Sequence, residues 1–454
     1  MDETPLQPAP PSTPKIDAPL LDAPLLEAIE AGAAIVTVNR RLAAHLHEAY
    51  GAQQRSARLE VWATPDILPL SAWVRRGWDA AREALAGRGG AEEPPVLLPD
   101  HVAAAVWETL VKDSEAGAEL LNPEGAAGLA AKAYKLEHQW RLPRESPGAP
   151  ASEELRAYRA WAERYEARCN DEGWLDGALL AERVADAVKR GAVPVPTRLM
   201  VTGFDEVPPQ EAALFEALAA AGCQVERHEP KLQPAAAVRA AFPDPLAEIE
   251  AAARWARRLL EQGAPGPIGI VAPRLEAIRA DVERIFRDLL SPGEPLRPFG
   301  AREPFDISLA PPLAEAPLVQ AALLLLRPWH RPAPADEISQ VLLSPFFSGA
   351  ERELTARAAL DARLRRWGAP ALDWGTVANL AGEGETACPK LREAIEGARA
   401  AEGKQPASQS PAQWAAAFAG ILNDLGWPGE RTQSSAERQA FEAWRECLGE
   451  FARL

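Results

Sequence analysis

The sequence predicts an α/β protein in which helix dominates strand, built from two α/β units that each carry a large helical segment. Short apolar runs rich in Val and Ile alternate with helix-length segments in two separate parts of the chain. Between and after those parts, apolar residues recur at the three- and four-residue spacing of helices. A length of 454 residues is enough for several domains.

The first unit is expected from two pieces of the chain, 17–70 and 191–235, after a Pro-rich tail at 1–16 that is expected to be disordered. Its predicted elements, in order, are a helix ending near Gly32, a strand at 35–39, a helix at 40–50, a strand at 59–62, a strand at 198–204, a helix through Leu218 and a strand at 224–227. Strands that alternate with helices predict parallel pairing.

Residues 71–190 are expected to form a helical insertion, because Trp73, Val74, Trp78 and Ala81 begin a long helical pattern. The second unit is expected to start in 236–305. Its predicted elements are a strand near 238–242, a helix at 245–262 ended by Gly263, a strand at 267–272 and a helix at 274–290. Residues 306–454 read as a further helical region.

Composition narrows the classes of function. A net charge of −16 argues against a wholly basic nucleic-acid-binding surface, although it leaves room for a local basic channel. The apolar runs are far short of a membrane span and no signal peptide is visible, so a cytoplasmic protein without a membrane partner is expected. The four cysteines are far apart and the histidines lack metal-ligand spacing, so no metal site is predicted.

The junction between the first strand and its helix has an informative sequence. A nucleotide-driven motor would place G-x-x-x-x-G-K-[ST] here, whose backbone N–H groups and lysine hold phosphates. This chain has Val38-Asn39-Arg40-Arg41 instead, and its one Gly-Lys pair, Gly403-Lys404, follows a helix. Asp205-Glu206, at the end of a later strand, is the acidic pair that would bind magnesium in such a motor. No catalytic residue and no Mg-ATP cofactor is therefore predicted.

A metal-dependent nuclease would need a Glu-x-Lys triplet on a strand. The chain has two, Glu229-Pro230-Lys231 and Glu402-Gly403-Lys404, of which the first contains a strand-disfavouring proline and the second lies in a polar linker. Neither is assigned a role.

Arginines beside tryptophans are candidate contacts to DNA, because Arg pairs with phosphates and Trp stacks on bases. The ordinary alternatives are solvated helix faces for the arginines and helix packing for the tryptophans. The candidates are Arg75, Arg76, Trp140, Arg141, Arg254, Arg257, Arg258, Arg363, Arg365, Arg366 and Trp367.

Four stretches together resemble a known family. They are IVTVNRRLAAHL at 35–46, LMVTGFDEVPPQEAALFEAL at 199–218, the region 242–286 with FPDPLAEIEAAARWARRLLEQG and IGIVAPRLEAIRADVERIF, and the helical segments FDISLAPPLAEAPLVQAALLLLR, LLSPFF and AERQAFEAWRECL between 305 and 448. In order and spacing they resemble the AddB- and RecC-type helicase-like proteins of bacterial DNA repair and recombination.

The resemblance implies two RecA-like units with large helical insertions. Relatives continue with the closing part of the second unit, so the second unit is expected to be incomplete here, because the sequence is a fragment or because another polypeptide completes the fold. The resemblance also implies that Asn39, Arg40, Arg41, Asp205 and Glu206 mark a vestigial nucleotide cleft. Relatives usually continue into a C-terminal PD-(D/E)XK nuclease. The sequence stops at Leu454 before any such domain, so nuclease activity does not transfer.

Three functions stay open at this point. The first is a non-catalytic repair scaffold that binds DNA, single-stranded or at duplex ends, and a helicase or nuclease partner subunit. The second is an active ATP-dependent helicase subunit, which would need a lysine supplied from elsewhere to reach Asp205-Glu206. The third is a protein-interaction module that does not bind DNA, which the acidic net charge favours.

Overall fold

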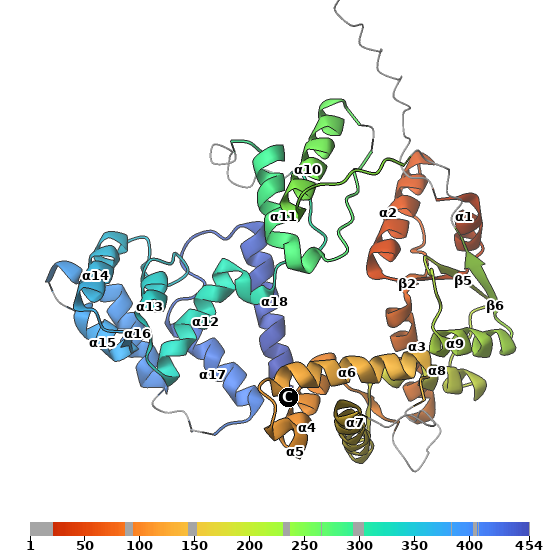
Figure 1. Cartoon of the computed structure of the whole chain (residues 1–454), viewed down its shortest axis with the longest axis horizontal. Helices are drawn as coiled ribbons and strands as arrows, with labels where there is room; N and C mark the ends of the chain where they lie inside the picture. The colour runs from red at the N-terminus through yellow and green to blue at the C-terminus, as the bar shows by residue number, and fades with distance from the viewer. Residues whose placement is uncertain are drawn as a thin grey trace, which may run out of the picture. The chain divides into compact units, whose positions relative to one another are not determined.

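The fold is taken from a computed structural model of the chain, which describes residues 21–86, 94–143, 152–229, 237–264, 266–293, 304–382, 384–402, 406 and 408–453. It divides into two compact units, residues 1–239 and 240–454 (Figure 1). Helix dominates strand in both, and the main sheet is parallel, as the sequence predicts.

Unit 1 is organised around a four-stranded parallel sheet with the order β2-β1-β5-β6. Its strands are β1 (Ala34–Thr37), β2 (Ile67–Pro69), β5 (Arg198–Thr202) and β6 (Gln224–His228). Val36 on β1 is in register with Leu68 on one side and Val201 on the other. Two pieces of chain more than a hundred residues apart therefore meet in one sheet.

Helices cover both faces of this sheet, as burial of a parallel sheet requires (Figure 1). On one face Ile35, Ile67 and Met200 pack against α1 (Ala23–Glu30) and α2 (Arg40–Ser56). On the other face the alternate residues Val36, Leu199 and Val201 join a second core. That core is completed by helices α3 (Leu70–Ala86), α8 (Leu180–Lys189) and α9 (Pro209–Ala220). The period of two along each strand thus divides the apolar residues between two cores.

Within the predicted insertion at 71–190, residues 96–179 form a helical subdomain with its own core, whereas α3 and α8 pack on the sheet. The elements of this subdomain are β3 (Val96–Leu97), α4 (Asp100–Lys112), α5 (Glu115–Ala118), α6 (Pro123–Trp140), α7 (Glu153–Asp171), β4 (Trp174–Leu175) and the short 3-10 helix η1 (Gly177–Leu179). Trp107 stacks on Tyr165 with ring centroids 4.4 Å apart, and the Tyr165 hydroxyl donates to Asp176 Oδ2 at 2.5 Å. The indole N–H of Trp161 donates to Ser114 Oγ at 2.8 Å, so this buried polar atom is satisfied too.

Unit 2 begins with a helical hairpin, α10 (Pro245–Glu261) and α11 (Leu275–Leu290). Ile249 and Ala253 on α10 pack against Ile285 and Phe286 on α11. Asp244 caps α10, accepting from the backbone N–H of Ala247 at 2.8 Å, which ties the helix start to a sequence signal.

The rest of unit 2 is mainly helical, with one short pair of strands. Its elements are η3 (Leu313–Glu315), α12 (Pro317–His330), β7 (Ala333–Pro334), α13 (Ala335–Leu342), α14 (Leu354–Trp367), β8 (Ala371–Leu372), α15 (Trp374–Leu380), η4 (Gly384–Thr386), α16 (Pro389–Glu402), α17 (Pro411–Asp424) and α18 (Ser435–Phe451). Strands β7 and β8 form a short antiparallel pair. Two buried tryptophans anchor the core: Trp374 donates to the Leu325 carbonyl at 3.1 Å and Trp427 to the Leu318 carbonyl at 2.9 Å.

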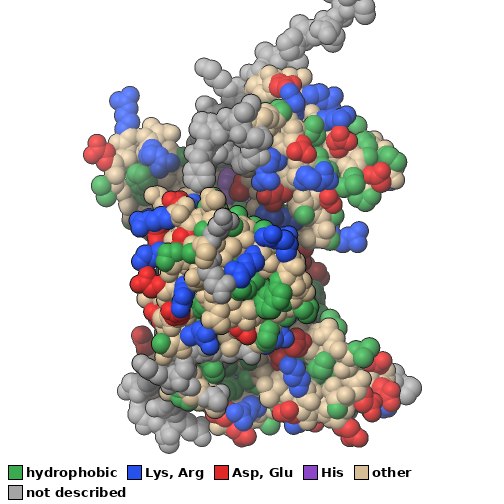
Figure 2. All heavy atoms as spheres, turned by 90° about the vertical axis from the view of Figure 1, so that its left-hand side faces the viewer, with side chains coloured by type: hydrophobic (Ala, Val, Ile, Leu, Met, Phe, Trp, Pro, Cys, Tyr) green, Lys and Arg blue, Asp and Glu red, His purple; other side chains and the backbone are tan. Residues whose placement is uncertain are grey.

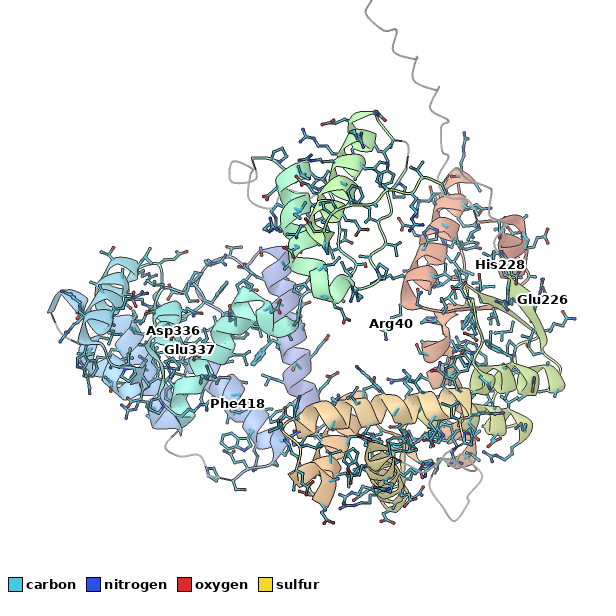
Figure 3. All side chains as sticks on the ribbon, viewed as in Figure 1. Arg40, Glu226, His228, Asp336, Glu337 and Phe418 are labelled. Atoms are coloured by element: carbon cyan, nitrogen blue, oxygen red, sulfur yellow. The ribbon has the colours of Figure 1, made fainter. Side chains whose placement is uncertain are left out.

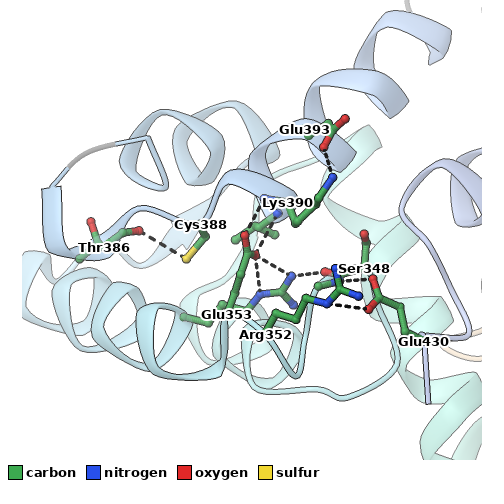
Figure 4. A network of polar contacts seen from close by, with 11 residues as sticks. Ser348, Arg352, Glu353, Thr386, Cys388, Lys390, Glu393 and Glu430 are labelled. Carbon is green, nitrogen blue, oxygen red and sulfur yellow. Dashed lines mark hydrogen bonds and ion pairs between the residues drawn. The ribbon is translucent and has the colours of Figure 1, made fainter. Parts of the chain in front are cut away.

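A buried polar network joins α14 to the start of α16 (Figure 4). The Glu353 carboxylate accepts from the backbone N–H groups of Lys390 at 2.6 Å and Leu391 at 3.1 Å. It also pairs with the Arg357 guanidinium at 3.2 Å. Arg357 is fully buried, lies over the Phe347 ring and donates to the Ser348 carbonyl. Glu353 thus satisfies both a helix N-terminus and a buried cation.

Three predicted strands are wrong. The strand expected at 59–62 is irregular with Val61 exposed, and the edge strand β2 forms at Ile67–Pro69 instead. The strands expected near 238–242 and at 267–272 are also irregular and largely exposed. Apolar β-branched residues are common in strands, but a strand forms only where a neighbouring strand pairs with it. Within the described ranges of unit 2, no sheet lies beside 267–272.

Some predictions fall outside the described residues, namely the tail at 1–16, Lys231 and Gly403-Lys404. Among the helices of the described segments, none is long and apolar enough to cross a bilayer.

Candidate functional site at the sheet switch point

The strand order of the main sheet indicates where a ligand site is expected. The chain moves outward from β1 to β2 in one direction and from β5 to β6 in the other. The order therefore reverses between β1 and β5, and ligands of open α/β sheets bind outside the carboxyl ends of the strands at such a point. Residues 38–41 and 203–206 follow these two neighbouring strands directly, so the structure brings the two predicted halves of the cleft to the same edge.

The first half is a tight strand-to-helix junction. Asn39 is extended and its side-chain oxygen accepts from the backbone N–H of Leu42 at 2.9 Å, which caps α2. The Thr37 hydroxyl donates to the Asn39 carbonyl at 2.8 Å. In a phosphate-binding loop the N–H groups of this helix end would face the ligand. Here one of these groups, the N–H of Leu42, already donates to the side-chain amide oxygen of Asn39.

The second half is held close to the first. Gly203 has a φ of +81°, and a Cβ built there would lie 2.4 Å from Leu42 Cδ2. Arg227 on β6 donates to the backbone carbonyls of Phe204 and, at 3.2 Å, of Asp205. The backbone of the acidic turn is therefore fixed, while the side chains of Asp205 and Glu206 lie on the surface.

Arg40 and Arg41 occupy the first turn of α2 and are exposed, and Figure 3 shows the Arg40 side chain directed away from the strands. A helix N-terminus carries partial positive charge, so two arginines here are unfavourable for the helix by a few tenths of a kcal/mol or more each, roughly. The first turn of α2 itself contains no acidic residue.

These residues do not fit a magnesium nucleotide. Neither half of the cleft contains a lysine, and Asn39 already caps the helix that would receive the phosphates. No step of nucleotide chemistry is derived through Asp205 and Glu206.

Several predicted DNA contacts are already paired with carboxylates. Arg76 forms a two-pronged ion pair with Asp66 at 2.7 and 2.8 Å, from a neighbouring segment. The other paired arginines are bridged within one turn of their own helices: Arg254 to Glu250, Arg257 to Glu261 and Arg365 to Asp361. Pairs of this kind are ordinary on exposed helix faces. Their charge is partly cancelled before any phosphate approaches.

The remaining candidates are Arg75, Trp140, Arg141, Arg258, Arg363, Arg366 and Trp367. Trp367 is 59% exposed at the end of α14, whereas Arg363 donates to Thr386 Oγ1 at 3.3 Å and Arg366 to the Ala362 carbonyl at 3.2 Å. All candidates come from α3 and α6 of unit 1 and α10 and α14 of unit 2. In neither unit do the two helices pack closely. On the face shown in Figure 2, Lys and Arg side chains are interspersed with Asp and Glu, without a continuous basic field.

A buried polar chain that the sequence analysis missed lies near the same edge. Thr202 Oγ1 is 2.9 Å from His228 Nδ1, and His228 Nε2 is 2.6 Å from Asp22 Oδ2. Figure 3 labels His228 on β6. The order Thr–His–Asp resembles a nucleophile relay. Thr202 is only 4% exposed, so no substrate reaches its hydroxyl, and the chain ties α1 to β5 and β6. No local signal reveals this contact, because Asp22 and His228 are far apart in sequence.

Comparison with known proteins adds no assignment, since no family model and no curated protein matches this chain.

Proposed function

We propose that the chain is a non-catalytic, helicase-like scaffold of DNA repair or recombination, which binds DNA phosphates at the switch point of unit 1. In this proposal unit 1 is a RecA-like unit whose phosphate loop has been replaced by the Asn39 cap. Unit 2 is a second such unit that lacks its strands. The anion bound beside α2 is then a backbone phosphate of DNA, single-stranded or at a duplex end, and a helicase or nuclease subunit is the expected partner.

One observation carries the proposal. Arg40 and Arg41 stand at the positive end of α2, at the crevice where α/β sheets bind their ligands. Arginine is suited to phosphate because its planar guanidinium offers several N–H donors at once. The absence of a lysine and the capped helix end favour a passive backbone contact over turnover of a nucleotide.

A second candidate is a protein-interaction module that does not bind DNA. The net charge of −16 and the ion pairs made by Arg76, Arg254, Arg257 and Arg365 favour it. The ATP-dependent alternative makes a separate prediction, magnesium-dependent ATP turnover that Asp205→Ala abolishes. The residues present favour no turnover by the unaltered chain.

Fluorescence anisotropy of labelled single-stranded and forked DNA, at several salt concentrations without nucleotide, tests the proposal. If Arg40 and Arg41 each contact a phosphate, the slope of log affinity against log salt becomes shallower by about 1.4 for single strands in the variant Arg40→Gln/Arg41→Gln. The matched control is Arg164→Gln/Arg168→Gln, which removes the same charge from the exposed face of α7. Absence of binding at low salt, or equal losses in both double variants, would refute the proposal.

A further inference from the structure

A cavity of about 300 Å³ opens in unit 1, away from the switch point. One wall is the face of α3 formed by Trp73, Gly77 and Ala80, and the other is the segment 193–196. Asp66 directly precedes β2 and residues 193–196 precede β5, so the cavity lies at the amino edge of the parallel sheet. Arg40 and Arg41, the proposed phosphate contacts, follow the carboxyl end of β1. The two sites are therefore separate.

The cavity has an apolar interior and a charged rim. Apart from Asp66 and Arg76, its lining consists of tryptophan, glycine, alanine, valine and proline. The rim pair is two-pronged, with both carboxylate oxygens of Asp66 within 2.8 Å of Arg76 nitrogens. Two of the five guanidinium N–H groups are used in this pair and three remain. The rim is thus electrically neutral but still able to donate and accept hydrogen bonds.

The second wall is held in place by the fold. Gly77 lets α8 approach α3 closely, because a Cβ there would lie 3.3 Å from Val184 Cγ1, and the same Cβ position is 3.8 Å from Val193 Cγ1 of this wall, an ordinary contact distance. Pro194 and Pro196 have fixed φ angles and no backbone N–H, which keeps the wall stiff and apolar. A preformed cavity loses little conformational entropy when it is filled.

We propose that this cavity receives one apolar side chain of a partner polypeptide. The backbone amide of that residue meets the rim, with its C=O accepting from Arg76 and its N–H donating to Asp66. A ligand with a net charge would meet like charge from one of the two rim residues, whereas a peptide amide is neutral and dipolar. Interface anchors of this kind are single large side chains seated in pockets with a polar rim.

Size and surroundings favour a polypeptide over a free small molecule. The volume lies at the lower end of the range for small-molecule pockets, and the cavity is open to solvent. The segment that leads to Asp66 also exposes Leu59 and Val61, which are 47% and 86% exposed. Along this segment a polypeptide partner therefore has exposed apolar side chains to contact in addition to the cavity itself. This inference does not depend on DNA binding.

Saturation-transfer NMR on the full chain tests the proposal with blocked amino acids as probes. N-acetyl-leucine methylamide is expected to bind weakly, and the glycine analogue, which lacks the side chain, is expected to give no signal. Ala80→Leu fills the cavity and should reduce the leucine signal at least fivefold. Ala44→Leu, an equal change at an exposed site on α2 outside the lining, should leave it unchanged. Equal signals from both variants would overturn the site.

The rim and the class of ligand are tested separately. The double variant Asp66→Asn/Arg76→Gln should weaken binding of the leucine probe severalfold. If circular dichroism shows that Ala80→Leu is unfolded, this double variant is used in its place to test the site. A neutral seven-residue peptide with a central leucine should bind at least tenfold more tightly than the blocked amino acid. Equal affinity, or tighter binding of benzoate or benzylammonium than of the leucine probe, would show a small-molecule site and refute the polypeptide partner.

Discussion

Gly203 shows how one residue holds the two halves of the candidate cleft together. Its φ of +81° is unfavourable for any residue with a Cβ, and the added atom would also meet Leu42. We expect Gly203→Ala to destabilise unit 1 by about 1–2 kcal/mol from the backbone alone, with a further loss from the contact. Urea denaturation followed by circular dichroism measures the total loss in the free energy of unfolding. Faster hydrogen exchange of the β1 and β5 amides would show that the loss arises in unit 1.

Gly222→Ala is the matched control for this prediction. Gly222 has a φ of +95°, and no atom lies within 4 Å of the position that a Cβ would take, so its substitution introduces backbone strain without the contact. Combining Gly203→Ala with Leu42→Ala should recover the part due to the contact. If Gly203→Ala costs no more than Gly222→Ala, the two halves are not packed as closely as the structure shows.

Glu353 is the residue on which the buried network of unit 2 depends. Replacing it with glutamine leaves the Arg357 guanidinium buried without a counter-charge and weakens the cap of α16. Breaking one partner of a buried pair costs about 3–5 kcal/mol, and we expect a loss of this order in urea denaturation of unit 2. Glu393→Gln removes an exposed partner of Lys390 on the same helix and should change the midpoint negligibly. Similar effects of the two substitutions would contradict this role of Glu353.

At the scale of elements, helix α18 has a pH-dependent start. Ser434 and Glu437 form a reciprocal capping box, and Arg431 pairs with the Glu437 carboxylate. Burial raises the pKa of Glu437, but the hydrogen bonds from Ser434 and the Arg431 charge outweigh it, so the pKa is lowered overall. A carboxylate with a lowered folded-state pKa stabilises the fold above its unfolded pKa, and the effect is lost as the pH falls through the folded value.

We therefore expect Glu437→Gln to destabilise unit 2 by about 1 kcal/mol at pH 7 and progressively less below roughly pH 4. Urea denaturation across this pH range measures the difference from the unaltered chain. Glu442→Gln changes an exposed carboxylate of the same helix, and its effect on the free energy of unfolding should not decrease in this way as the pH falls. A Glu437→Gln deficit that persists at pH 3 would contradict the role of this carboxylate in the cap.

The elements also show which parts of the fold the sequence predicts. Helices α2, α9, α10 and α11 and strands β1, β5 and β6 lie within a few residues of their predicted positions. Their caps, glycine stops and periodicity are local signals. The strand predicted at 267–272 is wrong because an apolar run predicts burial but does not supply a pairing partner. Edge strand β2 escapes prediction because Ile67-Leu68-Pro69 is too short for a periodic signal.

The candidate site, like the fold, is predictable from the sequence only in part. The Asn39 junction and Asp205-Glu206 are visible in the sequence as the ends of two predicted strands, and their proximity follows once both strands are parallel neighbours. The pairing of Arg76 with Asp66 and the contact of Asp22 with His228 depend on how separate elements pack. Such contacts are not encoded in any local pattern. For the same reason the cavity beside α3 has no sequence signature.

At the scale of the whole molecule, each described hydrophobic core draws its residues from one unit. The cores of unit 1 run from Leu21 to Val225, and those of unit 2 from Ile249 to Leu448. Domains with separate cores behave as separate cooperative units unless a large apolar interface couples them. A substitution that destabilises one core is therefore expected to leave the other unchanged.

Hydrogen exchange with mass spectrometry tests this expectation with one variant from each unit. Gly203→Ala should raise exchange across the sheet and helices of residues 21–229 and leave the core of residues 317–451 at its original protection. Glu353→Gln should do the reverse, because the network it breaks lies wholly within unit 2. Faster exchange in both cores from either variant would mean that the units fold as one.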